Sequence, residues 1–252
     1  VSQKYNNKYF NLLTGSNKMD DYFEDTDQYI LKDKIITCAI KHVVFDGWSE
    51  TTISKICNEL ALNREQFDYL FPRGGLDLAL FFHEIGDLEF KSTFSITHDS
   101  FREMRVRDKI EYALYYRLQI AFHRSEVVRR SLTFFSNPLY IFDGARSIWS
   151  TSDIIWNIVG DDSDDLNWYS KRAILATVYS ASLLFGLDDD SVDKNETKEF
   201  VHRRIEDVMS FQTLRQKAKG APFFGSLIRK FDESNYSRTG FKKQFPGYKN
   251  GG

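Results

Sequence analysis

Apolar positions recur every three or four residues along most of the chain, the spacing that places side chains on one face of a helix. Between residues 29 and 71 this spacing predicts three short helices in succession. Thr51 or Thr52 is expected to cap the second helix, and Asn63 the third. Three short helices with such tight connections are typical of a helix-turn-helix arrangement.

Longer helical patterns follow, over residues 76–94, 106–122, 127–135, 138–156, 161–187 and 200–209. The 252 residues include only four prolines and 14 glycines, which suits helices better than a fold with many turns. We therefore predict an all-α protein with a helix-turn-helix unit followed by a larger helical bundle. Its expected parts are a flexible arm at 1–28, a helix-turn-helix-like subdomain at 29–73, a ligand-binding helical domain at 74–212 and a basic tail at 213–252.

The helix expected over residues 161–187 has two different halves. From Ala173 onward both of its faces are apolar, so this half is expected to lie in a core. Ser163 is a plausible cap for its acidic start. The next two turns, which we expect to be exposed, carry a stripe of residue types that dominate binding hot spots: Asp165, Asn167, Trp168, Tyr169 and Arg172. Packing of Trp168 in a core or a dimer interface is the alternative.

The charge of the chain is unevenly distributed. Residues 211–252 hold nine Lys or Arg and two acidic residues, although the whole chain has a net charge of −2. A basic tail on an acidic body favours an anionic partner, either phospholipid or nucleic acid. Within the tail, Pro222 suits a first helical turn, and the residues after it predict an amphipathic helix that lies on a membrane surface, with a last core helix as the alternative: Phe223, Phe224, Leu227, Ile228 and Phe231.

The sequence contains no phosphate-binding, hydrolase or metalloprotease motif, so we predict neither a catalytic site nor a cofactor. Glu199 and His202 form an ExxH pair, but a di-iron bundle needs two such pairs. The acidic residues at 188–193 lack the spacing of a calcium loop and predict a solvated turn. Cys38 and Cys57 have no CxxC spacing and are interpreted as buried thiols in a reducing compartment, with no metal site.

The helix-turn-helix unit does not have the charge that DNA binding requires. Residues 30–73 contain six Lys or Arg and six Asp or Glu, and are therefore neutral. Phosphate contacts supply much of the affinity of a DNA-binding protein, so a basic face is needed. Glu65 and Asp68 on the third helix would repel phosphate. We therefore expect no nucleic-acid partner.

Aromatic residues are abundant, with 22 Phe and 13 Tyr. Many lie in the middle helices, where they could enclose an apolar cavity for a ligand. Ordinary core packing is the alternative for each of them. The residues predicted to line such a lipid-binding cavity are Phe81, Phe82, Tyr115, Leu118, Phe122, Tyr179 and Leu183.

A family resemblance rests on five segments: VVFDGWSETTI, LFPRGG, DLALFF, DLNWYSKRAILATVYSASLLF and FVHRRIEDVMSF. They resemble the mitochondrial coenzyme Q (ubiquinone) biosynthesis accessory proteins, a lipid-binding family with a TetR-like fold. The resemblance covers about residues 35–211, and its most specific part is the Asn-Trp-Tyr helix. The helix-turn-helix also resembles that of TetR repressors, from which it departs at Glu65 and Asp68.

The resemblance implies a protein without catalysis of its own, peripheral to the matrix side of the mitochondrial inner membrane. Such a protein binds an isoprenoid lipid or quinone intermediate and associates with a di-iron hydroxylase of ubiquinone biosynthesis. The stripe from Asp165 to Arg172 would be its partner surface, and Phe223 to Phe231 its membrane helix. A homodimer is typical of the fold. The chain begins at Val1, so a targeting segment is expected to have been removed or omitted. A ligand-responsive DNA-binding regulator is the alternative function.

Overall fold

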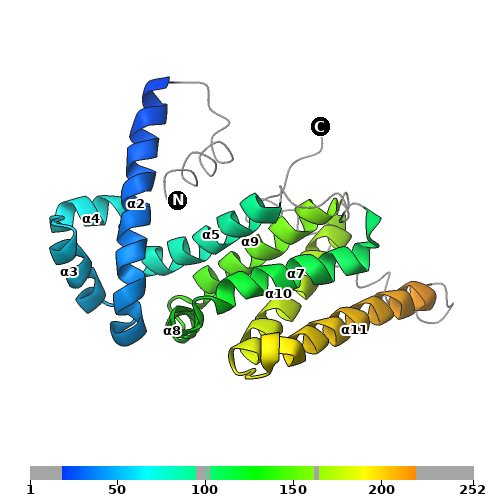
Figure 1. Cartoon of the computed structure of the whole chain (residues 1–252). Helices are drawn as coiled ribbons and strands as arrows, with labels where there is room; N and C mark the ends of the chain where they lie inside the picture. The colour runs from blue at the N-terminus through cyan, green and yellow to red at the C-terminus, as the bar shows by residue number, and fades with distance from the viewer. Residues whose placement is uncertain (1–18, 95–100, 102, 162–164, 220–252) are drawn as a thin grey trace. The chain divides into compact units, whose positions relative to one another are not determined.

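The computed structural model describes residues 19–94, 101, 103–161 and 165–219. These residues form helices and no strands, which confirms the predicted all-α class. The elements are α2 (Met19–Asp46), α3 (Glu50–Glu59), α4 (Arg64–Leu70), α5 (Gly75–Phe94), α7 (Val106–Phe122), α8 (Ser125–Phe135), α9 (Ile141–Val159), α10 (Asp165–Leu187), the 3₁₀ turn η1 (Val192–Lys194) and α11 (Asn195–Lys219) (Figure 1).

The chain divides into two compact units. Unit 1 comprises Val1–Glu103 and Tyr116–Ser147, and unit 2 comprises Met104–Tyr115 and Ile148–Gly252. The division falls within α7 and α9, whereas the sequence placed a boundary at residue 73. The reason is that α5 and α8 pack against α2 and therefore cluster with the helix-turn-helix.

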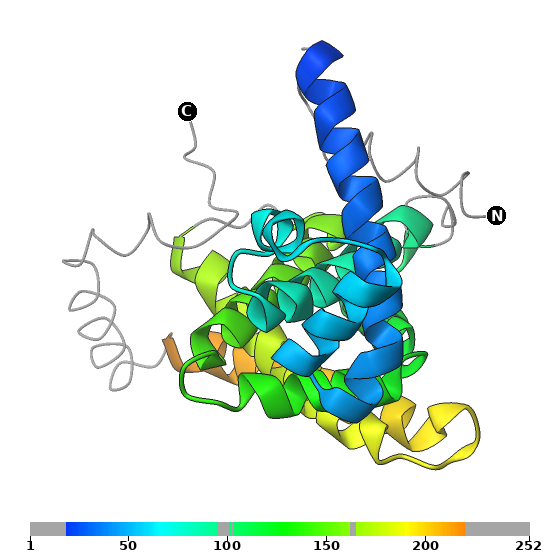
Figure 2. The same cartoon turned by 90° about the vertical axis from the view of Figure 1, so that its left-hand side faces the viewer.

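Unit 1 contains the predicted helix-turn-helix, in which α3 packs on the C-terminal half of α2 (Figures 1 and 2). Asn63 caps α4 as predicted, in a capping box with Gln66. The prediction for α3 was wrong, because Ser49 is its cap and accepts a hydrogen bond from the backbone N–H of Thr52. The Thr52 hydroxyl is buried and instead donates to the carbonyl oxygen of Gly47 at 2.7 Å.

Trp48 connects the turn after α2 to the rest of unit 1. Its indole N–H donates to the hydroxyl of Ser131 on α8 at 3.0 Å, and its ring lies 5.7 Å from that of Phe82 on α5. The start of α5 approaches the Trp48 backbone so closely that a Cβ at Gly75 would lie 2.2 Å from the carbonyl oxygen. Only glycine fits there without a backbone shift.

In unit 2, α10 and α11 lie side by side (Figures 1 and 2). The rings of Phe185 and Phe200 stack between them at 4.5 Å. The acidic segment that joins the two helices was predicted to be solvated, but Asp189 is only 5% exposed. Its carboxylate accepts hydrogen bonds from the backbone N–H groups of Ser191 and Thr197, both at 2.8 Å, and so caps the first turn of α11. A solvated turn was predicted because the segment is acidic. Asp189 becomes buried only through the backbone groups that it caps.

Two predictions concern the ends of the chain. Residues 19–28 were expected to belong to a flexible arm, but α2 already begins at Met19. The predicted membrane helix, Phe223, Phe224, Leu227, Ile228 and Phe231, lies outside the described residues. Among the helices that are described, none has an apolar stretch of the length needed to span a membrane.

Candidate functional site

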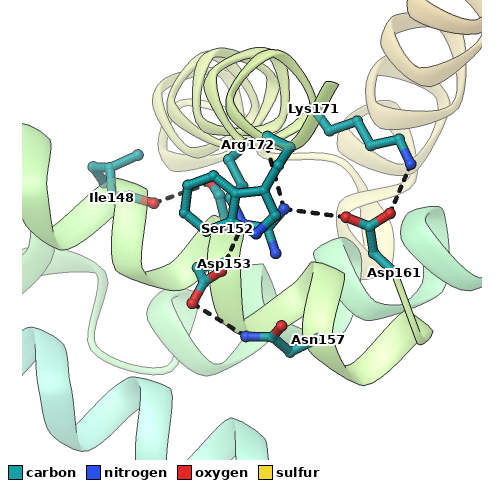
Figure 3. Close-up of polar contacts among 8 residues, drawn as sticks. Ile148, Ser152, Asp153, Asn157, Asp161, Lys171 and Arg172 are labelled. Carbon is teal, nitrogen blue, oxygen red and sulfur yellow. Dashed lines mark hydrogen bonds and ion pairs between the residues drawn. The ribbon is translucent and has the colours of Figure 1, made fainter. Parts of the chain in front are cut away.

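Arg172, in the second turn of α10, is the centre of a buried ion-pair network within unit 2 (Figure 3). Its Nε donates to Asp153 of α9 at 2.6 Å, and its Nη1 donates to Asp161, just after α9, at 3.1 Å. Asp161 also accepts a bond from the Lys171 ammonium group at 2.6 Å. Two carboxylates therefore balance two cations, which makes the burial of Arg172 and Asp161 tolerable.

An aromatic cluster covers this network. The guanidinium group of Arg172 lies 3.9 Å from the centre of the Trp168 ring, a close cation–π contact. Trp168 in turn packs edge-on against Tyr169 at 4.9 Å, and the Trp149 ring of α9 lies 6.0 Å from Trp168 and 6.3 Å from Tyr169. The start of α10 is thereby fixed to α9 by ring contacts as well as by charge.

The expectation of an exposed stripe at the start of α10 needs a correction. Trp168 is 9% exposed and Arg172 only 1%, because α9 supplies both a carboxylate for the guanidinium and a ring against the indole. Tyr169 remains partly exposed. Asp165 and Asn167 lie in the first turn of α10, and their side chains are outside the described part of the structure.

A small apolar cavity adjoins this network within unit 2, beside the stretch of α10 from Lys171 to Val178. Its volume is about 20 Å³, enough for a water-sized group. Helices α7, α9, α10 and α11 line it with Ile110, Trp156, Lys171, Ile174, Leu175, Val178, Ile205 and Val208. The Lys171 ammonium group that binds Asp161 lies 5.1 Å from the Trp156 ring centre. The ion-pair network is therefore the polar end of an apolar cavity.

Trp156, one of the residues that line this cavity, carries a further polar group. The indole N–H of Trp156 is buried, and no acceptor for it is found among the described residues. A buried donor without a partner is costly, and such groups are often completed by a ligand or a water molecule. Aliphatic walls, an ammonium group and an indole N–H suit a mainly apolar molecule that carries an oxygen at one end.

The seven residues predicted to bind lipid do not line this cavity. Phe81, Phe82, Leu118 and Phe122 belong to unit 1, where Phe81 packs against Phe71 and Phe82 against Trp48. Tyr115, Tyr179 and Leu183 belong to unit 2. Tyr179 and Leu183 are buried, and the Tyr115 hydroxyl donates to the backbone of Asp193 at 3.1 Å. Their role in lipid binding stays a prediction.

The sequence analysis missed the acidic partners Asp153 and Asp161 and the contributions of Lys171 and Trp156. A usable signal existed in α9, where Asp153 directly precedes the apolar run Ile154, Ile155 and Trp156. An acidic residue in such a run requires a cationic partner when the helix is buried. Arg172 is that partner, but its pairing becomes evident only when α9 and α10 are placed side by side.

In the helix-turn-helix of unit 1, the cations of α3 and α4 are engaged in ion pairs. Arg64 of α4 binds Glu50 at 2.6 Å and Asp68 at 2.8 Å, and Lys55 of α3 binds Asp46 at 2.6 Å. Phosphate would have to displace these carboxylates and would meet exposed Glu65 beside them. The contacts agree with the charge argument against DNA binding.

The segment that contains the ion-pair network is similar in sequence to known proteins. Residues 141–212, which contain the network and most of the cavity wall, match the COQ9 family model. The chain is 30% identical to the "Probable ubiquinone biosynthesis protein coq9, mitochondrial" of Dictyostelium discoideum, over 71% of this chain and 60% of that protein. It is 26% identical to the "Ubiquinone biosynthesis protein COQ9, mitochondrial" of Homo sapiens, over 81% of this chain and 65% of that protein. The matches thus span less than two thirds of either relative.

A solved structure shares the fold. The TetR transcriptional regulator from Nitrosomonas europaea superposes with a TM-score of 0.57, covering 70% of this chain and 96% of the regulator at 15% identity. At that identity the likeness concerns the fold alone, and it confirms the predicted TetR-like class. The family resemblance seen in the sequence is confirmed as well, because this chain is similar to COQ9 ubiquinone biosynthesis proteins and its residues 141–212 match the COQ9 family model within a TetR-like helical fold.

Proposed function

We propose that this chain is a non-catalytic, lipid-binding accessory protein of ubiquinone biosynthesis, which binds an isoprenoid quinone intermediate and presents it to a di-iron hydroxylase. The names of its relatives support a mitochondrial location. A peripheral position on the matrix side of the inner membrane is part of the proposal and rests on the family resemblance alone. The observation that carries the proposal is the apolar cavity with a polar end, within the segment that matches the COQ9 family.

The chemistry of the cavity suits the two ends of such a lipid. The side chains of Ile174, Val178 and Ile205 offer an apolar wall to an isoprenoid tail. The Lys171 ammonium group and the Trp156 indole N–H are donors, and the oxygens of a quinone head group are acceptors. Because the cavity holds only a water-sized group when closed, a lipid must displace the α11 side chains that form one of its walls.

Tyr169 is our proposed contact with the hydroxylase. It is partly exposed, and its ring is held by Trp168 and Trp149, so little conformational entropy is lost when a partner covers it. Trp168 and Arg172, buried beneath it, would position the tyrosine rather than form the interface. The basic tail around residues 223–231 is proposed to hold the protein at an anionic bilayer.

Lipid extraction from the purified chain tests the binding proposal. Mass spectrometry should detect an isoprenoid lipid in the wild-type protein, and Val178→Phe should reduce its amount several-fold by filling the cavity. Val192→Phe, at a position that is 78% exposed, is the matched control and should keep the lipid. Circular dichroism must show that Val178→Phe is folded, because overpacking costs about 1–3 kcal/mol. Lipid-free wild-type protein, or equal lipid in folded Val178→Phe, would overturn the proposal.

A binding assay with the hydroxylase tests the partner surface. Tyr169→Ala should weaken the complex by about tenfold or more, as expected when an aromatic hot spot is truncated. Leu184→Ala removes a side chain that is 56% exposed on the same helix and should leave affinity unchanged. Equal affinities of the two variants would place the interface elsewhere.

A further inference from the structure

Three side chains that bind metals in other proteins meet in unit 1, far along the sequence from the lipid cavity. Cys38 and His42 lie one turn apart on α2, and Glu59 is the last residue of α3. The ligand atoms of the three residues lie within 4.8 Å of one another. The Cys38 thiol donates to one oxygen of Glu59 at 3.2 Å, and His42 Nε2 lies 2.6 Å from the other.

The packing of α3 on α2 brings this cluster together (Figures 1 and 2). Residues four apart on a helix point to the same side, so Cys38 and His42 face the same neighbour. Helix α3 then delivers Glu59 from a point 17 residues beyond His42. The absence of CxxC spacing had argued against a metal site, but cysteine and histidine at i and i+4 on one helix can also share an ion.

The distances are close to those of a coordinated ion. With bonds of about 2.3 Å to sulfur and about 2.0–2.1 Å to nitrogen or oxygen, a tetrahedral zinc site separates its ligand atoms by about 3.4–3.6 Å. The contacts of 3.2 and 2.6 Å to the two Glu59 oxygens are somewhat shorter, so Glu59 needs to move away by roughly 1 Å or less to admit an ion. Rotation of the exposed Glu59 side chain can supply that movement.

The charges and the burial also suit a divalent cation. A thiolate and a carboxylate carry two negative charges, which neutralise a doubly charged ion. Cys38 is buried, whereas the side chains of His42 and Glu59 are 18% and 46% exposed, so one side of the cluster is open to water. Thiolate and imidazole are ligands that zinc-class ions prefer, whereas magnesium and calcium prefer oxygen ligands. The donor set therefore favours a zinc-class ion.

We propose that Cys38, His42 and Glu59 bind a divalent transition-metal ion of the zinc class, with water as the fourth ligand, and that the ion fixes α3 to α2. This site is independent of the lipid-binding function proposed above, because all three ligands lie in unit 1. The bound ion would join the two helices at the end of α3 opposite to its Ser49 cap. It would thereby stabilise the helix-turn-helix without taking part in chemistry.

Cobalt titration of the full chain tests the proposal, since cobalt replaces zinc and its bond to a thiolate has a charge-transfer absorption band. After treatment with a chelator, the wild-type chain should develop this band with one equivalent of cobalt, and zinc should abolish it. Cys57→Ser is the matched control, because Cys57 lies on the same unit outside the cluster and its variant should retain the band. Cys38→Ser should lose it.

Two further variants keep the test decisive if Cys38→Ser folds poorly. His42→Gln and Glu59→Gln retain the thiol and should weaken cobalt binding by about tenfold or more, since loss of even an outer-shell partner costs 10–100-fold. Zinc should also raise the Tm of the wild-type chain and leave that of His42→Gln unchanged. A wild-type chain without a thiolate band, or His42→Gln and Glu59→Gln with wild-type affinity, would overturn the proposal.

Discussion

Replacing Arg172 by Met would test whether the start of α10 is held by buried charge. Methionine keeps much of the apolar stem that packs under Trp168 and removes the guanidinium group. Asp153 and Asp161 then lose their shared partner, and Trp168 loses a cation–π contact of 3.9 Å. The variant therefore isolates the charge of Arg172 from its volume.

The expected loss in the free energy of unfolding follows from the exposure of each group. Breaking a buried pair by removing one partner costs about 3–5 kcal/mol. The lower end applies here, because the Asp161 side chain is 2% exposed but keeps Lys171 at 2.6 Å, while that of Asp153 is 15% exposed and can reach water. We expect a loss of about 3 kcal/mol, a large part of the stability of a typical domain at about 5–15 kcal/mol.

Urea unfolding followed by tryptophan fluorescence measures this loss. Three of the four tryptophans, Trp149, Trp156 and Trp168, belong to unit 2, so the signal reports mainly on the unit that contains the network. Arg203→Met is the matched control on α11, because its ion pair with Glu199 is exposed on both sides and is expected to contribute less than about 1 kcal/mol. A change in the midpoint with an unchanged m-value would show that stability alone has changed.

A second substitution distinguishes uncompensated charge from lost packing. Asp161→Asn in the Arg172→Met background removes the most buried carboxylate, and Lys171, with a side chain 29% exposed, can then turn to water. The double variant should recover part of the lost stability. If Arg172→Met unfolds like the control, Arg172 is solvated in solution. The sequence-based prediction that Arg172 belongs to an exposed partner surface would then stand.

The other predictions concern a cap, a histidine and a close backbone contact. Asp189→Ala removes the cap of α11 and should cost about 1–2 kcal/mol at neutral pH. Burial alone would raise the pKa of Asp189, but hydrogen bonds from Ser191 and Thr197 hold it well below the ordinary value. The stability difference between Asp189→Ala and wild type, measured by urea unfolding, should therefore shrink below about pH 4. The hydrogen bond to Glu111 raises the pKa of His202, so its stabilising contribution is present below about pH 6.5 and is lost as the pH rises through the raised value. Glu111→Gln should return the pKa toward its ordinary value in an NMR titration, and an unchanged titration would rule out the contact. Gly75→Ala places a methyl group 2.2 Å from the Trp48 carbonyl oxygen and should lower stability by about 1–3 kcal/mol in thermal melts; an unchanged Tm would contradict that contact.

The helical class was predictable because its determinants are local. Apolar spacing reports which side of each helix is buried, and caps such as Asn63 mark the helix ends. The errors also have local causes. Ser49 and Thr52 both offer a hydroxyl near the start of α3, and only the backbone course after Gly47 decides which one caps it. The signal was present in the sequence, but the choice between neighbours depends on three-dimensional placement.

The candidate site was less predictable because its geometry depends on pairs that are distant in sequence. Arg172 meets Asp153 from 19 residues away, and His42 meets Glu59 from 17. A stripe of Trp, Tyr and Arg is typical of a binding surface, and the same residue types also form buried cation–π contacts. The sequence gives residue types and spacing, whereas burial depends on which carboxylates the neighbouring helix presents.

The burial of Arg172 changes what kind of recognition the start of α10 can provide. An exposed arginine would offer a partner a mobile charge, at the cost of ordering a long side chain upon binding. Here the guanidinium group is fixed by two carboxylates and lies against the Trp168 ring, which packs edge-on against Tyr169. The Lys171 ammonium group, bound to the same Asp161, lies on the cavity wall. A lipid oxygen that drew Lys171 away from Asp161 would leave that carboxylate bound to Arg172. Cavity occupancy and the order of the Tyr169 surface would then be coupled through one aspartate.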